Sequence, residues 1–596
     1  MNSKQKTKPI PLRRGFLVLL SAILAIALGG CNPSNFKTEA AQVTQLVAQT
    51  AADPKTFNFA FLDQYPNVFG FIYEGLIFES GTGEIEPALA ESWKISDDKQ
   101  RIVFTLREGL KWSDGEPLTA DDVVFTYNDI FFNNKIPNGF RDTLKIGESG
   151  ALPTVRKLDI RQVEFTTPEP FAPFLRNTGY AILPAHALRE TVTAQDSKGN
   201  PKFLSTWGTD TAPAKIIVNG PYKIENYIPS QRVVFRRNPY YWRKDAQGNS
   251  MPYIERIVWQ IVESTDTAII QFRSGGLDSL KITAANFSLL KREEKRGDFT
   301  IYNGGPDSGT LFMTFNLNKG QRNGRPLVNP IKSRWFNTVA FRQAVAYAID
   351  RQTMINSILQ GLGELQDSPI SVQSPYYLSP QEGLKVYDYN PERSRELLLK
   401  AGFKYNAADQ LLDADGNRVR FTMLTNAGSR RIEAIGAQIK RDLSKIGIQV
   451  DFTPIDFSTL VDKTSNALDW ECYLGSITGS VEPHGGSTIW FLDGQLHAFN
   501  QKPQVGQAPI SGQEFADWER KIERLYIEGA REFDEAKRKA IYAETQRIAQ
   551  EYLPFIHLVN PLVLDVVRNR VQGVKVSSLY YEQVLWNVFE LKVVDK

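Results

Sequence analysis

The side chains whose chemistry could build a metal or redox site are few in this chain. They are four histidines and two cysteines: His186, His484, His497, His557, Cys31 and Cys472. His484 and His497 are thirteen residues apart, whereas a metal centre needs a larger set of converging ligands. Two cysteines exclude a disulfide framework and any CxxC-type site. The sequence therefore predicts no resident metal and no cofactor.

Carboxylates are the other groups that could do chemistry, and glycoside hydrolysis needs only two of them in the right place. The chain has 67 Asp and Glu residues, so such a pair cannot be recognised from composition. The HExxH, GxSxG and P-loop motifs do not occur in the sequence. We therefore expect a binding protein rather than an enzyme, with an exported hydrolase as the less favoured alternative.

The first thirty residues have the pattern of an export signal. Five Lys or Arg residues within 1–14 precede an uncharged apolar run over 16–28. This run is shorter than the roughly 20 apolar residues that cross a bilayer, so it predicts a signal peptide over 1–30. Arg13-Arg14 also suits a twin-arginine signal, and the export route stays open.

The residues that follow the apolar run indicate a lipid anchor. Leu28-Gly29-Gly30-Cys31 resembles the lipobox of bacterial lipoproteins, in which the cysteine is lipidated and begins the mature chain. Acyl chains on Cys31 would hold the protein on a membrane face, with residues 31–52 as the tether. Whether the inner or the outer membrane holds the anchor stays open.

Composition and charge describe a large exported body. The chain has 596 residues, 42% of them hydrophobic, and a net charge of +3. Residues 1–30 hold five of the positive charges and no acid, so the mature chain has a net charge of −2. Binding to nucleic acid needs a basic surface, and we therefore expect no nucleic-acid partner.

Helical and strand-like patterns alternate along the mature chain, which predicts an α/β fold. A half-buried strand is expected over 101–107, and Thr119 has the features of a helix N-cap. The other elements that the periodicity predicts are helices over 337–359, 429–446 and 515–552, and strands over 449–452 and 556–566.

Several sequence blocks, in order, resemble the family 5 extracellular solute-binding proteins of oligopeptide, dipeptide and nickel ABC importers. The resemblance covers about residues 50–590. The blocks that carry it are Pro87-Ala88-Leu89-Ala90-Glu91-Ser92-Trp93, the segment from Phe104 to Phe125, Asn219-Gly220-Pro221-Tyr222, Arg237-Asn238-Pro239-Tyr240-Tyr241-Trp242 and the segment from Phe341 to Arg351.

This resemblance implies a two-lobed periplasmic-binding-protein-like fold with a hinge and an additional subdomain in the first lobe. The first lobe would comprise residues 53–75, 206–312 and 560–596. The additional subdomain would span 76–205, and the second lobe 313–559. The ligand would lie between lobes that close on it.

In peptide-binding members of the family, an acidic residue of the second lobe pairs with the free amino group of the peptide. The corresponding position here falls on Thr478 or Gly479, and no Asp or Glu occurs between Cys472 and Val481. Either Glu482 has taken this role, or the ligand lacks a free α-amine. The segments that the resemblance places against ligand contain Asn58, Phe59, Ala60, Ile282, Thr283, Tyr473, Ser476, Thr478, Gly479, Glu482 and Trp490.

The resemblance also implies the partners of this protein. We expect a monomer that captures a peptide or peptide-like solute and delivers it to the permease subunits of an ABC importer. It would work in the periplasmic space or on a cell-envelope face. A lipoprotein of the same fold that senses a ligand or chaperones peptides is the alternative, and the sequence does not identify the solute.

Overall fold

The computed structural model describes residues 43–61, 68–147, 149–504, 507–580 and 583–594. Cys31, the expected signal peptide over 1–30 and most of the expected tether lie outside these ranges. Within the described ranges, none of the helices combines the length and the apolar character that a membrane span requires.

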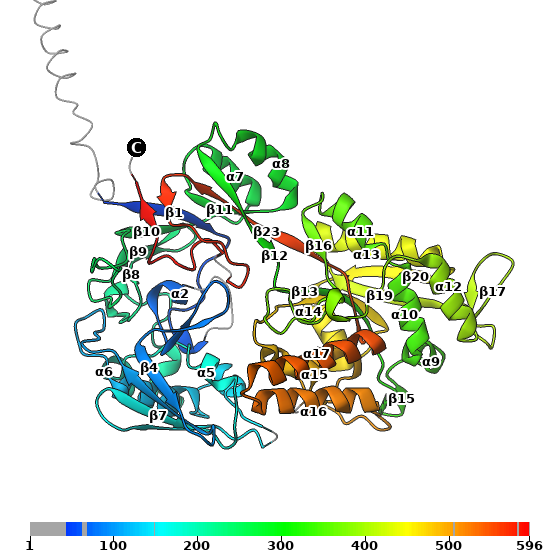
Figure 1. The fold of residues 1–596 in the computed structure, drawn as a ribbon, viewed down its shortest axis with the longest axis horizontal. Coiled ribbons are helices and arrows are strands. Elements are labelled where there is room, and N and C mark those ends of the chain that lie inside the picture. The colour runs from blue at the N-terminus through cyan, green and yellow to red at the C-terminus, as the bar shows by residue number, and fades with distance from the viewer. Residues whose placement is uncertain (1–42, 62–67, 148, 505–506, 581–582, 595–596) are drawn as a thin grey trace, which may run out of the picture.

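The first lobe is organised around an eight-stranded mixed sheet that collects strands from distant parts of the chain (Figure 1). Its strand order is β12-β23-β11-β1-β10-β9-β8, and β16 pairs with β23. The strands are β1 (Gln45–Thr50), β8 (Tyr222–Ile228), β9 (Arg232–Arg237), β10 (Arg256–Ile261), β11 (Ser279–Ile282), β12 (Phe299–Pro306), β16 (Gly363–Leu365) and β23 (Val559–Arg568). Helices α7 (Thr265–Arg273) and α8 (Ala284–Glu293) pack near β11 and β23.

The first strand corrects the expected tether over 31–52. Gln45–Thr50 pairs in parallel with Arg256–Ile261 over its whole length. Leu46, Ala48 and Thr50 are buried while the residues between them are half-exposed, which is the period of two that a sheet strand requires. Residues 45–50 therefore belong to the folded lobe, and any tether ends before them.

The additional subdomain contains a four-stranded antiparallel sheet in the order β4-β5-β7-β6. Its strands are β4 (Ala90–Ile95), β5 (Arg101–Leu106), β6 (Thr154–Lys157) and β7 (Gln162–Thr166). Helix α3 (Ala120–Val124) begins at Thr119, whose capping box with Asp122 confirms the expected N-cap. The side chains of this subdomain share one hydrophobic cluster with Val233, Ile257 and Trp259 of the large sheet, so the subdomain and that face of the sheet fold as one core.

The second lobe has a five-stranded sheet with the order β20-β19-β21-β13-β22 and its own hydrophobic core. The strands are β13 (Thr310–Phe315), β19 (Arg420–Asn426), β20 (Gln449–Ile455), β21 (Cys472–Ile477) and β22 (Phe555–His557). The main helices are α9 (Pro330–Asn337), α10 (Val339–Ala348), α12 (Pro391–Lys400), α13 (Arg430–Ser444), α16 (Asp517–Arg531) and α17 (Glu535–Tyr552). Helix α13 confirms the helix expected over 429–446, with Ser429 accepting from the Ile432 amide at its start.

Two of the expected helices were predicted too long. The segment 337–359 is divided at Asp350, and the segment 515–552 is divided between α16 and α17. In both breaks an aspartate caps a new helix: Asp350 accepts from the Thr353 amide and Asp534 from the Lys537 amide, each at 2.9 Å. A side-chain carboxylate that satisfies a free amide allows a helix to restart after a bend.

Two crossings of the described chain between the lobes lie side by side, and β16, which comes from the second-lobe part of the chain, pairs with β23 next to them (Figure 1). One crossing joins β12 to β13 through 307–309, and the other joins β22 to β23 at Leu558. The Asn560 side chain donates to the carbonyls of Asp307 and Gly309, both at 2.9 Å, and so ties the crossings together. The second lobe thus begins at 310 rather than at the expected 313.

Candidate functional site: the cavity between the lobes

A cavity of about 1150 Å³ lies between the two lobes. Its first-lobe wall comes from 70–79 and from 143–180 in the subdomain, its second-lobe wall from 480–530, and its remaining wall from the returning segment 579–589. Pockets for drug-sized ligands have about 300–1,000 Å³. The cavity therefore has room for a ligand of several residues or rings.

Aromatic rings cover much of the cavity wall. Trp586 stacks on Phe78 with ring centroids 6.0 Å apart and on Tyr580 at 5.5 Å. On the opposite side, Phe171 meets the His484 ring edge to face at 4.9 Å. The other aromatic residues of the wall are Phe71, Tyr73, Tyr180, Phe491 and Phe589. Such rings offer large apolar contact area with little side-chain entropy to lose.

Glu482, the acidic residue expected as an amine anchor, lines this cavity but is already paired. The Arg538 Nη2 atom lies 2.7 Å from Glu482 Oε1, and the two side chains are 7% and 8% exposed. Glu482 also accepts from the His484 amide at 3.1 Å, which caps the short turn Pro483–Gly486. Burial disfavours the charged guanidinium, yet the Glu482 carboxylate holds the pKa of Arg538 above its usual value.

His484 is the only histidine among the described residues that line the cavity. Burial and, to a lesser extent, the Arg538 guanidinium lower the pKa of His484 to about 4. The imidazole is therefore uncharged at neutral pH. Its Nδ1 atom is buried without a hydrogen-bond partner in the described part of the chain.

The first-lobe wall has a second buried carboxylate, Glu74. It accepts a hydrogen bond from the Trp242 indole at 2.7 Å and another from the Tyr241 hydroxyl. Arg243 approaches the Glu74 carboxylate to 3.8 Å and stacks on the Trp242 and Phe589 rings. These contacts hold Glu74 against its own lobe.

The lobes touch at one edge of the cavity, where the subdomain meets the break between α16 and α17. Helix α5 (Phe174–Asn177) lies beside the orange helices of the second lobe in Figure 1. The Ala172 amide donates to the Ala530 carbonyl at 2.8 Å, and Arg531 forms two hydrogen bonds with Glu169, at 2.9 and 2.8 Å. The two lobes thus contact each other directly at this edge of the cavity.

The other residues of the second lobe that the sequence placed against ligand lie outside the lining of this cavity. Tyr473 and Ser476 are on β21, and Thr478 follows it at the surface. Gly479 packs against the Ser308 carbonyl, which lies only 1.7 Å from where a Cβ would be, so a side chain there would collide with the hinge. Trp490 is buried and stacks on Tyr526 in the core.

The first-lobe residues from the same prediction also lie away from the cavity lining. Asn58 is buried and donates to the carbonyls of Phe203 and Thr206. Phe59 and Ala60 are buried in the core, with the Phe59 ring stacked on Phe140 at 4.9 Å. Ile282 ends β11, and Thr283 precedes α8. Their role against ligand stays a prediction.

His484 and His497 do not converge. His497 is buried in the second lobe, where its ring nitrogens contact the Ile489 carbonyl at 2.9 Å and the Glu519 carboxylate at 3.2 Å. In the described ranges, no cluster of three or more His, Cys, Asp or Glu side chains could hold a metal ion.

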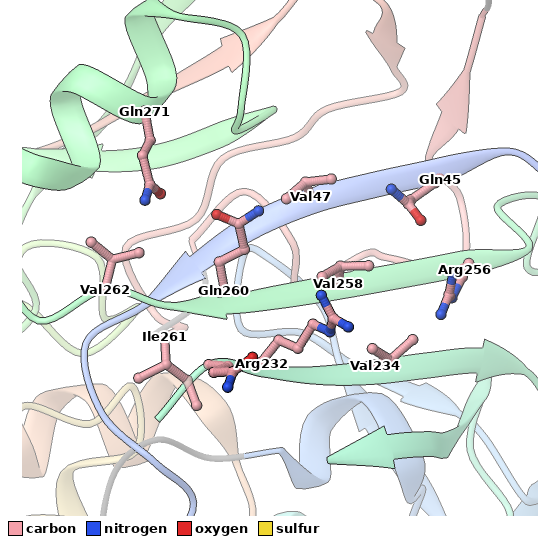
Figure 2. Close-up of a pocket in the computed structure, with 11 residues that line it drawn as sticks. Gln45, Val47, Arg232, Val234, Arg256, Val258, Gln260, Ile261, Val262 and Gln271 are labelled. Atoms are coloured by element: carbon pink, nitrogen blue, oxygen red, sulfur yellow. The ribbon is translucent and has the colours of Figure 1, made fainter. Parts of the chain in front are cut away.

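A second hollow lies entirely within the first lobe (Figure 2). This groove of about 550 Å³ runs over β1, β9 and β10, and Val47, Val258 and Arg232 are among the residues that line it. Because both of its walls belong to one lobe, closure of the lobes would not enclose a ligand there. The cavity between the lobes is the better candidate for ligand capture.

The comparison with protein families decides the identity of the fold and the class of protein. Residues 84–497 match the model of the bacterial extracellular solute-binding proteins, family 5. This chain belongs to that family. Family 5 consists of exported solute-binding proteins rather than enzymes, which agrees with a ligand cavity between two lobes.

The family 5 relatives are similar to this chain over most of its length. A probable ABC transporter-binding protein of Deinococcus radiodurans is 29% identical over 551 residues, which cover 87% of each chain. The oligopeptide-binding protein AppA of Bacillus subtilis is 25% identical and covers 77% of this chain and 79% of its own. The crystal structure of the substrate-binding protein CtaP from Listeria monocytogenes superposes with a TM-score of 0.72 at 20% identity, covering 92% of this chain and 99% of CtaP. The likeness to CtaP confirms the two-lobed α/β fold.

The sequence reasoning missed most of the cavity wall. Trp586, Tyr580 and Phe589 come from the returning segment, and Phe171 from the subdomain. Arg538 lies in the helical segment expected over 515–552, for which no contact with the cavity was predicted, and it is only 6% exposed. The density of aromatic residues over 578–589 is a signal that could have marked the returning segment as a ligand wall.

Proposed function

We propose that this family 5 protein captures peptides or a peptide-like solute in the cavity between its lobes and delivers it to the permease of an ABC importer. The observation that supports this proposal is the cavity itself, which has about 1150 Å³, aromatic walls and contributions from both lobes. The name of the Bacillus subtilis relative, an oligopeptide-binding protein, points to the same class of ligand.

Closure of the lobes is what makes such a protein a carrier. A ligand that contacts both walls favours the closed arrangement over the open one, and a permease can recognise that difference. The protein would act as a monomer, because the cavity is complete within one chain. It would stay at a membrane through lipid on Cys31, so that captured ligand is held near the permease.

The ligand is tested by identifying what the exported protein carries. We expect the purified protein to release a mixture of short peptides on unfolding, detected by mass spectrometry. Replacing Trp586, which stacks on two rings of the wall, by leucine should raise the Kd for a peptide pool about tenfold in calorimetric titrations. Trp93→Leu is the matched control, because Trp93 is also half-buried but does not line the cavity.

The outcome that would contradict this proposal is a Trp586→Leu protein with unchanged peptide affinity, or a protein that binds no peptide. The lipid anchor is tested separately. Cys31→Ser should move the protein from the membrane fraction to the soluble envelope fraction and abolish its labelling by radioactive palmitate. A Cys31→Ser protein that stays labelled would exclude Cys31 as the lipidated residue.

A further inference from the structure

Most of the described carboxylates on the walls of the cavity already have partners within the protein. Four of the described ones contact donor side chains: Glu74 with Trp242 at 2.7 Å, Glu79 with Arg176 at 2.5 Å, Glu169 with Arg531 at 2.8 Å and Glu482 with Arg538 at 2.7 Å. Of the other two, Glu523 accepts from the Leu492 amide at 3.0 Å, and Asp493 is exposed. Three of these carboxylates, those of Glu79, Glu169 and Glu482, are thus each paired with an arginine of the protein itself.

The partners of these carboxylates affect how a peptide with a free amino end could bind in the cavity. An α-ammonium has a pKa of about 7.7–8.0 and is mostly charged at pH 7. Burying such a charge is unfavourable unless a carboxylate or several acceptors compensate it. At Glu482 the ammonium would meet the Arg538 guanidinium, which already lies 2.7 Å from the carboxylate, and like charges would repel.

Uncharged groups surround Glu482 on the cavity side. His484 is neutral at pH 7 because burial and Arg538 lower its pKa to about 4. Its ring packs between Phe171 and Phe491, with centroids at 4.9 and 6.0 Å. Gly485 follows on the wall, and the Ser480 hydroxyl, a neutral polar group that also lines the cavity, lies 2.9 Å from where its Cβ would be. This part of the wall is suited to apolar and neutral polar groups.

We infer that the part of the ligand buried against Glu482 carries no ammonium group, so that the cavity takes peptide-like ligands with a blocked or absent α-amine. The inference rests on the proposed function, since it narrows the class of peptide-like solute. The Glu482–Arg538 pair acts here as a fixed neutral element of the wall and not as an anchor for an amine.

The test compares two matched probes on the full chain purified from cells that export it. One is a pool of mixed tetrapeptides with free amino ends, and the other is the same pool after N-acetylation. We expect the Kd of the acetylated pool, measured by calorimetric titration, to be no more than twice the Kd of the free pool. A loss of tenfold or more on acetylation would overturn the inference and leave the proposed function standing, whereas binding of neither pool would overturn both.

A substitution provides a second test that the same probes can measure. Arg538→Gln leaves the Glu482 carboxylate without its cation. The affinity for the free pool should therefore rise at least tenfold relative to the affinity for the acetylated pool. In the Glu482→Gln/Arg538→Gln protein, which has no charge at this place, that gain should disappear. An Arg538→Gln protein that folds, as judged by thermal unfolding, and shows no such gain would overturn the inference. If this variant does not fold, the comparison of the two pools on the unaltered protein still decides.

Discussion

Two of the glutamate–arginine pairs that border the cavity differ in burial and in what they join. Glu482 and Arg538 belong to the same lobe, and their side chains are 8% and 7% exposed. Glu169 and Arg531 belong to different lobes and are 28% and 43% exposed. The same two side-chain types therefore form a buried pair within one lobe and a partly exposed pair between the two lobes.

Burial is the physical reason for this difference. Removing one partner of a buried pair leaves a charge without compensation, whereas water solvates the charges of an exposed pair when it separates. A lobe that must keep its shape is suited to the first kind of pair. Two lobes that must separate to admit a ligand are suited to the second kind.

The largest expected effect comes from breaking the buried pair. Glu482→Ala leaves the Arg538 guanidinium buried without its carboxylate, and we expect the free energy of unfolding to fall by about 3–5 kcal/mol. Urea unfolding followed by circular dichroism measures this loss. The double variant Glu482→Leu/Arg538→Met should recover most of it, because apolar side chains of similar volume need no compensation.

A smaller effect is expected from the histidine beside the buried pair. The folded-state pKa of His484 is about 4, below the unfolded value of about 6.5, so the neutral imidazole stabilises the fold above pH 6.5. As the pH falls from 6.5 to 4, the unfolded chain binds the proton first, and up to about 3 kcal/mol of stability is lost. His484→Phe should reduce this loss between pH 7 and pH 4 in urea unfolding experiments.

His557 provides a reference for this measurement. Burial and Arg351 lower its pKa to about 3, so it contributes pH dependence of the same sign from the interior of the second lobe. His484→Phe should therefore remove the contribution of His484 to the pH dependence of stability and leave the contribution of His557. An unchanged pH dependence in the His484→Phe protein would show that this imidazole is as solvated in the folded state as in the unfolded one.

The smallest effect is expected from the pair between the lobes. Arg531→Gln should change the free energy of unfolding by no more than about 1 kcal/mol, as is usual for exposed pairs. It removes two of the contacts that hold the lobes closed, so the ligand-free protein should have a larger radius of gyration in X-ray scattering. Raising the salt concentration to 1 M should expand the unaltered protein in the same direction.

The Glu169→Gln protein is the matched control, since it breaks the same pair from the other lobe. Both variants should expand alike and lose their sensitivity to salt. A loss of several kcal/mol in stability in either variant would mean that this pair is as structural as the buried one, and the contrast between the two pairs would fail.

Structural features that depend on a few neighbouring residues could be predicted from the sequence. The N-cap at Thr119 and the helix that follows Ser429 are two features of this kind, and both were predicted from the sequence. The break at Asp534 was missed because the charged pattern on both sides of it is helical. That break places Ala530 and Arg531 against the subdomain, so the closing contact of the lobes could not be derived from the helix pattern.

The sequence by itself predicted the α/β class from its alternating helical and strand-like patterns, and its resemblance to family 5 implied the two-lobed arrangement. It also showed that the loop before Glu482 lacks an acidic residue. Only the tertiary structure showed that Glu482 is paired, because its partner Arg538 is 56 residues away along the chain. It likewise showed that Leu579, Tyr580, Leu585, Trp586 and Phe589 line the cavity. The sequence shows which side chains are ionisable. Which opposite charge compensates each of them depends on the distant side chains that the fold brings within a few ångströms.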